Sequence, residues 1–256
     1  MERVELDGFE AEFEIHGSGD PAVLIQAPPF VAWYRPLLAH LPGWAVLWYR
    51  RHDVMGSDVA DDARLCARLL AHVRFARPHV VGHSYGGIVA LELARQRSVD
   101  MRSLALLEPA PAGLSAPATA AVQMAPLLRM ARDSGAVTAM EHFLRGACGG
   151  LELEGLEQLV HGALRDASMH AERFFERELP AAIRWSFTPA DARLLNCPIL
   201  NLRGARSGAR FQEASAAIQS WFPSAERDVL DGACHLLMAQ RPEAAARCLE
   251  RFWDRA

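Results

Sequence analysis

Residues 80–87 read VVGHSYGG and stand between two segments of different character. The apolar run His79–Gly82 predicts a buried β-strand, and the stretch Gly86–Gln96 predicts a helix that starts at once. Glycines two residues before and after Ser84 allow a sharp turn from strand to helix, which lifts the serine hydroxyl clear of the sheet. The helix N-terminus there favours negative charge. Ser18, the only competing serine, lies in a hairpin-type turn and lacks a glycine two residues before it. The pattern Gly-x-Ser-x-Gly in this setting therefore predicts that Ser84 is a nucleophile.

Strands and helices alternate along most of the chain. The dipeptide Asp7-Gly8 predicts the turn of a β-hairpin formed by Val4–Leu6 and Phe9–Ile15. Further strands are predicted at Ala22–Gln26, Ala45–Tyr49, Arg102–Leu107, Pro198–Leu202 and Ala225–Leu230. Amphipathic helical stretches are predicted at Trp33–Leu41, Asp58–Phe75, Ala209–Trp221 and Pro242–Trp253. This alternation predicts an α/β fold with a mostly parallel, twisted sheet that helices cover on both faces.

The alternation stops between Pro109 and about Asp191, where no strand is predicted. Helical runs are expected there at Ala118–Arg132, Ala136–Arg145, Leu153–Arg165 and Ala171–Ile183, with Pro and Gly between them. We therefore predict a core made of residues 1–110 and 191–256, with a helical lid inserted at residues 111–190.

The composition excludes several classes of chemistry. All 27 of the Lys and Arg residues are arginine, so Schiff-base catalysis of the aldolase or pyridoxal-phosphate type is excluded, as is a P-loop lysine. The net charge of −4 leaves no basic excess to displace counterions, so nucleic acid is not an expected partner. The insertion's histidines, at 142, 161 and 170, lack metal-ligand spacing, and we expect neither a metal nor another cofactor.

The sequence also carries features that bear on location. No apolar run reaches the roughly 18 residues of a membrane helix, and residues 1–8 are acidic and lack the apolar stretch of a secretion signal. The cysteines are an odd, scattered set without a C-x-x-C pair, at positions 66, 148, 197, 234 and 248. Reduced thiols in a cytoplasmic protein away from membranes are therefore expected.

A serine hydroxyl is a weak nucleophile at neutral pH and needs a base. His235 lies just past the last predicted strand and before the final helix. A loop at that position reaches the carboxyl edge of the sheet, where Ser84 also emerges. A Ser-Lys dyad is excluded in a chain without lysine, which leaves His235 as the expected base. His83, next to Ser84, should point away from it and is interpreted as structural.

These features resemble those of the α/β-hydrolase superfamily, and the resemblance covers nearly the whole chain. It includes the N-terminal hairpin, the nucleophile turn at Ser84, the helical insertion and the late His235. The resemblance implies a hydrolase with a Ser, acid, His order along the chain and an acyl-serine intermediate.

The acid is the member of the triad whose position departs from the common pattern. In most of the superfamily it follows the strand after the lid, in a Gly-x-x-Asp pattern. Here that segment starts at Gly204 and has Ser207 where the Asp is expected, and no carboxylate follows before Glu213, inside a predicted helix. The common acid position is therefore vacant in this chain.

Glu108 offers another acid position, at the carboxyl end of the strand before the insertion. Haloalkane dehalogenases and the thioesterase domains of polyketide and peptide synthetases are similar in carrying their acid there, although a dehalogenase needs Asp in place of Ser84. The resemblance implies that Glu108 orients His235. The alternative is a strand-end carboxylate that pairs with arginine. Arg203 and Arg206 occupy the usual acid loop, where they either form that ion pair or bind a substrate anion.

A tetrahedral intermediate needs two N–H donors for its oxyanion. One is expected to be the backbone N–H of Tyr85. After the strand Ala22–Gln26 the chain reads Ala-Pro-Pro-Phe, so two donors are missing and the N–H of Phe30 is the expected second donor. Synthetase thioesterases are similar here, with a Pro-Pro-x stretch and a later Tyr-x-x-Leu like Tyr34–Leu37, although the loop is shorter in this chain.

The insertion is rich in large, adaptable apolar residues, namely Met124, Met130, Met140, Met169, Phe174, Phe175 and Trp185. Most are expected to pack lid on core, and those facing the cleft would suit a hydrophobic acyl chain. We therefore expect a thioesterase-like enzyme that hydrolyses or cyclises an acyl substrate, which an acyl or peptidyl carrier protein could deliver. A general carboxylesterase or lactonase shares the mechanism. A non-hydrolytic member that binds a ligand or steers a cyclisation without acylation is the other alternative.

Overall fold

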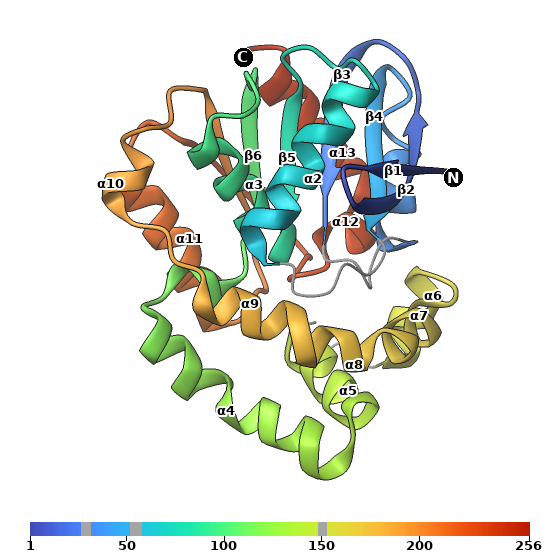
Figure 1. The fold of residues 1–256 in the computed structure, drawn as a ribbon, viewed down its shortest axis with the longest axis vertical. Coiled ribbons are helices and arrows are strands. Elements are labelled where there is room, and N and C mark those ends of the chain that lie inside the picture. Colours follow the sequence, from blue (N-terminus) through green and yellow to red (C-terminus); the bar gives the residue numbers. More distant parts are fainter. Residues whose placement is uncertain (27–31, 52–57, 148–152) are drawn as a thin grey trace.

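The chain forms one eight-stranded sheet with helices packed around it, in a computed structural model that describes residues 1–26, 32–51, 58–147 and 153–256 (Figure 1). The strand order is β1-β2-β4-β3-β5-β6-β7-β8, and every neighbouring pair from β4 to β8 is parallel. The strands are β1 (Glu2–Leu6), β2 (Phe9–His16), β3 (Asp20–Ile25), β4 (Trp44–Arg51), β5 (His79–His83), β6 (Ser103–Leu107), β7 (Ile199–Gly204) and β8 (Glu226–Leu230). The mostly parallel α/β sheet predicted from the sequence is confirmed.

The antiparallel edge of the sheet is the predicted hairpin. Asp7 and Gly8 have φ angles of 48° and 83°, which suit a tight turn between twisted strands. Leu6 pairs with Phe9 across the turn, and β2 then runs antiparallel to β4, with Phe13 opposite Tyr49.

The central strands are buried on both faces. Every residue of β5 and β6 is buried, which is why these strands read as continuous apolar runs rather than alternating ones. Figure 1 shows α2 (Val59–His72) and α3 (Tyr85–Gln96) on the near face and α13 (Pro242–Trp253) behind the strands. The remaining helices of this part are α1 (Arg35–Leu38), α11 (Ala209–Trp221) and α12 (Leu237–Gln240).

Among its described residues, the chain between β6 and β7 contains helices and no strand; α4 to α9 lie below the sheet in Figure 1, and α10 lies beside it. It comprises η2 (Pro111–Leu114), α4 (Pro117–Ser134), α5 (Ala136–Ala147), α6 (Leu153–Leu159), α7 (Ala163–Met169), α8 (Ala171–Arg173), the π-helical turn η3 (Phe174–Glu178), α9 (Leu179–Arg184) and α10 (Pro189–Ala192). The last of these, α10, crosses the predicted lid boundary at 190/191. None of the described helices is long and apolar enough to cross a membrane.

A buried histidine lies at the amino end of β5. His79 is wedged against Trp44 and Trp253, with ring centroids 5.4 and 5.3 Å away, and its Nδ1 is hydrogen-bonded to Ser103 Oγ at 2.7 Å. Burial, helped by the positive charge of Arg102, lowers the pKa of His79 to about 4.

This shift predicts a pH-dependent stability. His79 binds a proton near pH 6.5 in the unfolded chain but only near pH 4 in the folded protein. Between these two pH values the unfolded chain binds more protons, so the free energy of unfolding falls as the pH falls from 6.5 to 4. The residue should contribute a loss of about 3 kcal/mol in the free energy of unfolding, measured by urea titration between pH 7 and 4. His79→Asn should flatten the dependence. Parallel losses in the variant and the unchanged protein would contradict the assignment.

Candidate active site

Ser84 lies at the turn between β5 and α3, in a strained backbone conformation with φ 54° and ψ −122°. The two flanking glycines are required by close packing. A Cβ at Gly82 would come within 2.5 Å of the Gly86 carbonyl oxygen, and one at Gly86 within 2.0 Å of the Ile25 carbonyl oxygen. Glycine is therefore required at both positions of the Gly-x-Ser-x-Gly motif, because the turn packs too closely against α3 and β3 to leave room for a side chain.

His235 follows β8 and reaches Ser84 across the carboxyl edge of the sheet. Its Nε2 is 3.0 Å from Ser84 Oγ, within the reach that proton transfer from the hydroxyl requires. The ring is buried and lies between two aromatic rings: Phe211 stacks on it at a centroid distance of 4.0 Å, and His83 lies at 4.6 Å. Two ring neighbours limit the rotation of the imidazole and hold it toward Ser84.

Glu108 completes a chain of hydrogen bonds with His235. The Nδ1–H of His235 donates to Glu108 Oε2 at 2.9 Å, and Glu108 is 1% exposed. The other carboxylate oxygen, Oε1, accepts from the Gly204 N–H at 2.8 Å and from the Ser207 hydroxyl. Like Ser84, Glu108 has a positive φ (45°), a sparsely populated conformation that recurs at functional sites.

Neither arginine of the acid loop contacts Glu108. Nη1 of Arg203 donates instead to the Gly204 carbonyl oxygen at 3.0 Å, and the exposed Arg206 has no ion pair with any described residue. The ion pair with Glu108 considered from the sequence is therefore not formed. The other described donors to Glu108, the Gly204 N–H and the Ser207 hydroxyl, are neutral, so no described cation competes with His235 for this carboxylate.

Both ring nitrogens of His83 are hydrogen-bonded within the protein, which fits its structural interpretation. Its Nε2–H donates to the backbone carbonyl of His235 at 2.8 Å, and its Nδ1 accepts from the Tyr34 hydroxyl. Burial, and secondly the neighbouring His235, lower the pKa of His83 well below 6.5, so the ring stays neutral. Burial also raises the pKa of Tyr34 well above 10. Tyr34 and His83 thus support the loop that carries His235.

Of the two predicted oxyanion donors, Tyr85 and Phe30, the structure describes Tyr85. Tyr85 begins α3 directly after Ser84, and its side chain is fixed by a 2.8 Å hydrogen bond from its hydroxyl to Asp62. Phe30 lies outside the described residues. Both assignments stay predictions.

A cavity of about 430 Å³ opens on Ser84 and His235. Its walls come mainly from the helical insertion and are mostly apolar, with Met124, Leu127, Phe143, Phe174 and Leu179 among them. Polar side chains also line it, namely Gln123, His142, Glu178 and Arg210. Among the described residues, no group of three or more His, Cys, Asp or Glu side chains could hold a metal ion.

The apolar residues singled out from the sequence divide between several places. Met124 and Phe174 line the cavity, Phe175 lines a groove between α4 and α9, and Met140 is buried in the packing. Met169 is 63% exposed. Phe211, which stacks on His235, and Arg210, which lines the same cavity, were not predicted as site residues, because nothing in the sequence pattern of α11 separates these positions from the rest of an amphipathic helix.

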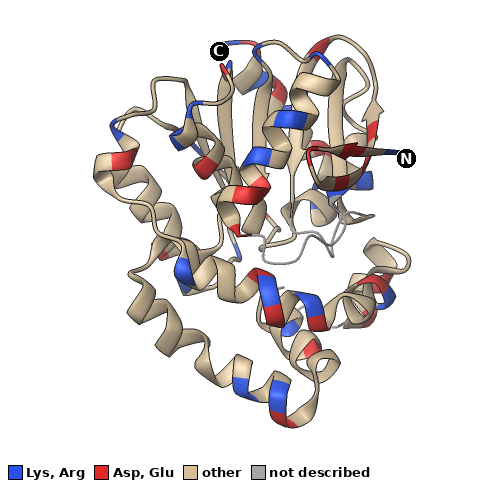
Figure 2. Cartoon of the chain, in the orientation of Figure 1, with Lys and Arg blue, Asp and Glu red and all other residues tan. Residues whose placement is uncertain are grey.

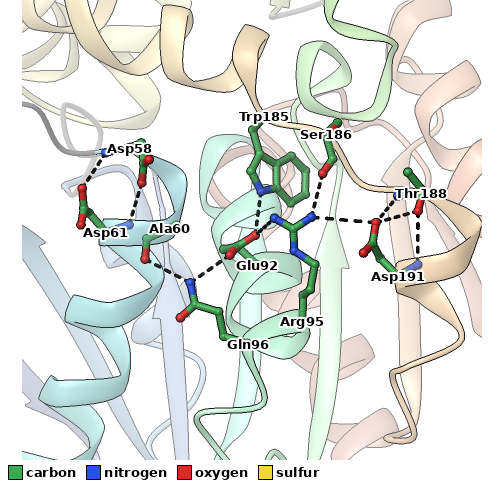
Figure 3. Close-up of polar contacts among 10 residues, drawn as sticks. All are labelled: Asp58, Ala60, Asp61, Glu92, Arg95, Gln96, Trp185, Ser186, Thr188 and Asp191. Carbon is green, nitrogen blue, oxygen red and sulfur yellow. Dashed lines mark hydrogen bonds and ion pairs between the residues drawn. The ribbon is translucent and has the colours of Figure 1, made fainter.

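Polar contacts join α3, the helix after Ser84, to the chain that leaves the helical insertion (Figure 3). The Trp185 indole N–H donates to the buried Glu92 Oε2 at 2.8 Å. Arg95 bonds the same carboxylate, donates to the Ser186 carbonyl oxygen at 3.1 Å, and lies 3.8 Å from Asp191 Oδ2. These contacts fix the end of the insertion to the helix that positions the nucleophile.

Trp185→Phe should lower the free energy of unfolding by about 1 to 2 kcal/mol, because it removes a donor to a buried carboxylate. Urea unfolding measures the change. Trp221→Phe is the matched control, since both indoles pack on Phe187 and Trp221 has no hydrogen bond to a described residue. Equal losses in the two variants would show that packing, not the hydrogen bond, stabilises this junction.

A strained serine between a parallel strand and a helix, a histidine after the last strand and a buried carboxylate together define the α/β-hydrolase class of protein. Residues 15–248 match the alpha/beta hydrolase family. The chain belongs to that family, and it is a hydrolase.

Solved structures show the same fold over nearly the whole chain. An enol-lactonase from Burkholderia xenovorans LB400 superposes with a TM-score of 0.83 at 19% identity, covering 99% of this chain and 100% of that one. A thermophilic esterase from Thermogutta terrifontis gives a TM-score of 0.77 at 20% identity, covering 100% and 99%. A bromoperoxidase from Bacillus anthracis gives 0.81 at 17% identity, covering 96% of each chain. No curated protein sequence matches this chain significantly.

Proposed function

We propose that the protein cleaves an ester or thioester of a hydrophobic acyl group through an acyl-Ser84 intermediate. The observation that carries the proposal is the continuous hydrogen-bonded chain from Ser84 through His235 to Glu108, which faces a largely apolar cavity. Carboxylate, imidazole and hydroxyl in this order form the charge arrangement that acyl transfer needs.

The reaction follows from that geometry. Ser84 Oγ attacks the carbonyl carbon as its proton passes to His235 Nε2, 3.0 Å away. The donors predicted from the sequence for the resulting oxyanion are the N–H groups of Tyr85 and Phe30. The carbon–oxygen or carbon–sulfur bond breaks, and the leaving group takes the proton from His235. Water, deprotonated by His235, then attacks the acyl-serine and regenerates Ser84. An acceptor hydroxyl or amine within the substrate would give cyclisation instead.

A thioesterase-like substrate is the form of this activity that we favour. Glu108 at the strand end and the Pro-Pro-Phe sequence at 28–30 support it, because synthetase thioesterases resemble this chain at both places. An acyl or peptidyl carrier protein is then the proposed donor of the acyl group. We also infer a cytoplasmic location, which the four described cysteines support because all are free thiols.

A carboxylesterase or lactonase is the second candidate. The structural likeness to an enol-lactonase and to esterases supports it, and the same residues would act in the same roles. Only the leaving group separates the two candidates: a thiol in the first and an alcohol, or the ring oxygen of a lactone, in the second.

Intact-protein mass spectrometry tests the proposal. Incubation with a panel of acyl thioesters, aryl esters and lactones should add the acyl mass to the protein, and a fluorophosphonate should add its own mass once. Ser84→Ala should acquire neither. If Ser84→Ala keeps the turnover or the biological effect and the unchanged protein acquires no acyl mass, the acyl-serine mechanism is overturned and the non-hydrolytic alternative is favoured.

A further inference from the structure

The segment 193–212, which contains β7, the loop to α11 and the first residues of α11, carries positive charge only. Residues 193–212 contain four arginines and no carboxylate, although the whole chain has a net charge of −4. Elsewhere acidic and basic positions lie close together, as along α2 and α8–α9 in Figure 2. The segment also contains Gly204, at the carboxyl end of β7, and Ser207, in the loop that follows; both donate to Glu108.

Arg210 brings that charge to the cavity itself. It lines the cavity with Ser84 and His235, and it is exposed, so it marks the place where the cavity meets solvent. The next residue, Phe211, stacks on the imidazole of His235 at 4.0 Å. The Arg210 guanidinium is therefore held one residue from a ring that contacts the catalytic base.

The charge of Arg210 is not cancelled by the protein. No carboxylate in the described part of the chain forms an ion pair with it, whereas Arg95, Arg102 and Arg173 each have one. Glu178, the acidic residue of the cavity wall, is fully buried and paired with Arg173 at 3.0 Å. A guanidinium in this position presents a forked set of donors that matches a carboxylate or phosphate.

We propose that Arg210 is a specificity residue that binds an anionic group on the leaving side of the substrate. The inference rests on the proposed function and narrows its substrate class to esters or thioesters whose leaving group carries a carboxylate or phosphate. The acyl side goes into the apolar interior of the cavity, so the leaving group extends past Arg210 toward solvent. The backbone N–H of Arg206 donates to the Ala233 carbonyl oxygen, two residues before His235, so a second exposed arginine of this segment is anchored to the chain that carries His235.

Three thioesters with one octanoyl chain test the proposal. Octanoyl-coenzyme A carries phosphates, S-octanoyl-3-mercaptopropionate a carboxylate, and S-octanoyl-N-acetylcysteamine no charge. At low ionic strength kcat/KM should be about tenfold higher for an anionic thioester than for the neutral one, and 0.5 M salt should reduce that ratio. A gain for coenzyme A alone identifies phosphate as the recognised anion, and a gain for both identifies any oxyanion.

Variants assign the effect to Arg210. Arg210→Ala should lower the anionic-to-neutral ratio about tenfold, mainly through KM, and Arg210→Lys should retain part of it. Arg193→Ala is the matched control, an exposed arginine of the same basic stretch that does not line the cavity, and it should leave the ratio unchanged. A ratio near one in the unchanged protein, or equal ratios before and after Arg210→Ala, overturns the inference. Failure of all three thioesters to acylate Ser84 would instead count against the thioesterase-like form of the proposed function.

Discussion

Replacing Ser84 with alanine should lower kcat by about five to six orders of magnitude toward any ester or thioester the protein turns over. Among the described residues of the site, the Ser84 hydroxyl is the group placed to form the acyl intermediate, because it lies 3.0 Å from the Nε2 of His235. Losses of this size are usual when the nucleophile of a serine hydrolase is removed, with the rest of the site giving a small residual rate. Single-turnover kinetics with an active-site titrant measure the change.

The controls for Ser84→Ala separate chemistry from folding. Alanine adopts the strained φ of 54° at the same cost as serine, so the melting temperature should change little. Ser18→Ala, in the exposed turn at residues 17–19, should keep full activity. Retained turnover in Ser84→Ala, with no labelling by a fluorophosphonate at another residue, would show that acyl transfer to Ser84 is not the mechanism.

The fold could be predicted from local sequence because its strands and helices have strong periodic signals. Ala209–Trp221 and Pro242–Trp253 are helices with the predicted ends, and the Asp7-Gly8 hairpin has the predicted turn. Strand ends differ from their predicted positions by at most two residues, as at β7, which runs on to Gly204. That extension places the Gly204 N–H against Glu108, a contact that depends on the register between two strands and not on either sequence alone.

Site residues could be predicted from the sequence only where a particular residue type at a particular position in the motif or loop indicates the role. The glycines around Ser84 and the placement of His235 after a strand are such signals, and the structure brings these two residues within 3.0 Å. Phe211 and Tyr34 act through contacts with residues 24 and 49 positions away. No local sequence pattern predicts these contacts, because they form between loops that are distant in the sequence and meet at one edge of the sheet.

The position of Ser207 shows why Glu108 can replace an acid in the usual loop. The ends of β6 and β7 are neighbours in the sheet, so a side chain from either strand end reaches the same side of His235. In this chain the carboxylate comes from β6, and the loop after β7 supplies a hydroxyl and an N–H to hold it. The role of Glu108 that the resemblance implies is therefore compatible with the geometry of the sheet, and it can be tested by substitution.

Glu108→Gln should lower kcat by about four orders of magnitude while KM changes little. The amide has the size of the carboxylate and can still accept from Gly204 and Ser207. However, its NH₂ group would face the Nδ1–H of His235 at the site of the present 2.9 Å hydrogen bond. The imidazole then adopts the other tautomer, which cannot take a proton at Nε2, and the imidazolium loses its counter-charge. Steady-state kinetics with the substrate identified by mass spectrometry measure the effect.

Three further variants make the result for Glu108 decisive. Glu108→Asp keeps the negative charge but places it one methylene further from His235. Its kcat should lie between those of the unchanged protein and Glu108→Gln, because aspartate tolerates the positive φ at this position. Ser207→Ala keeps the Glu108 carboxylate and removes one donor to it, so kcat should fall only about tenfold. Glu213→Gln, the next carboxylate along the chain after the vacant acid position, should behave as the unchanged protein. If Glu108→Gln keeps full activity while Glu213→Gln loses it, the acid is not at the end of β6.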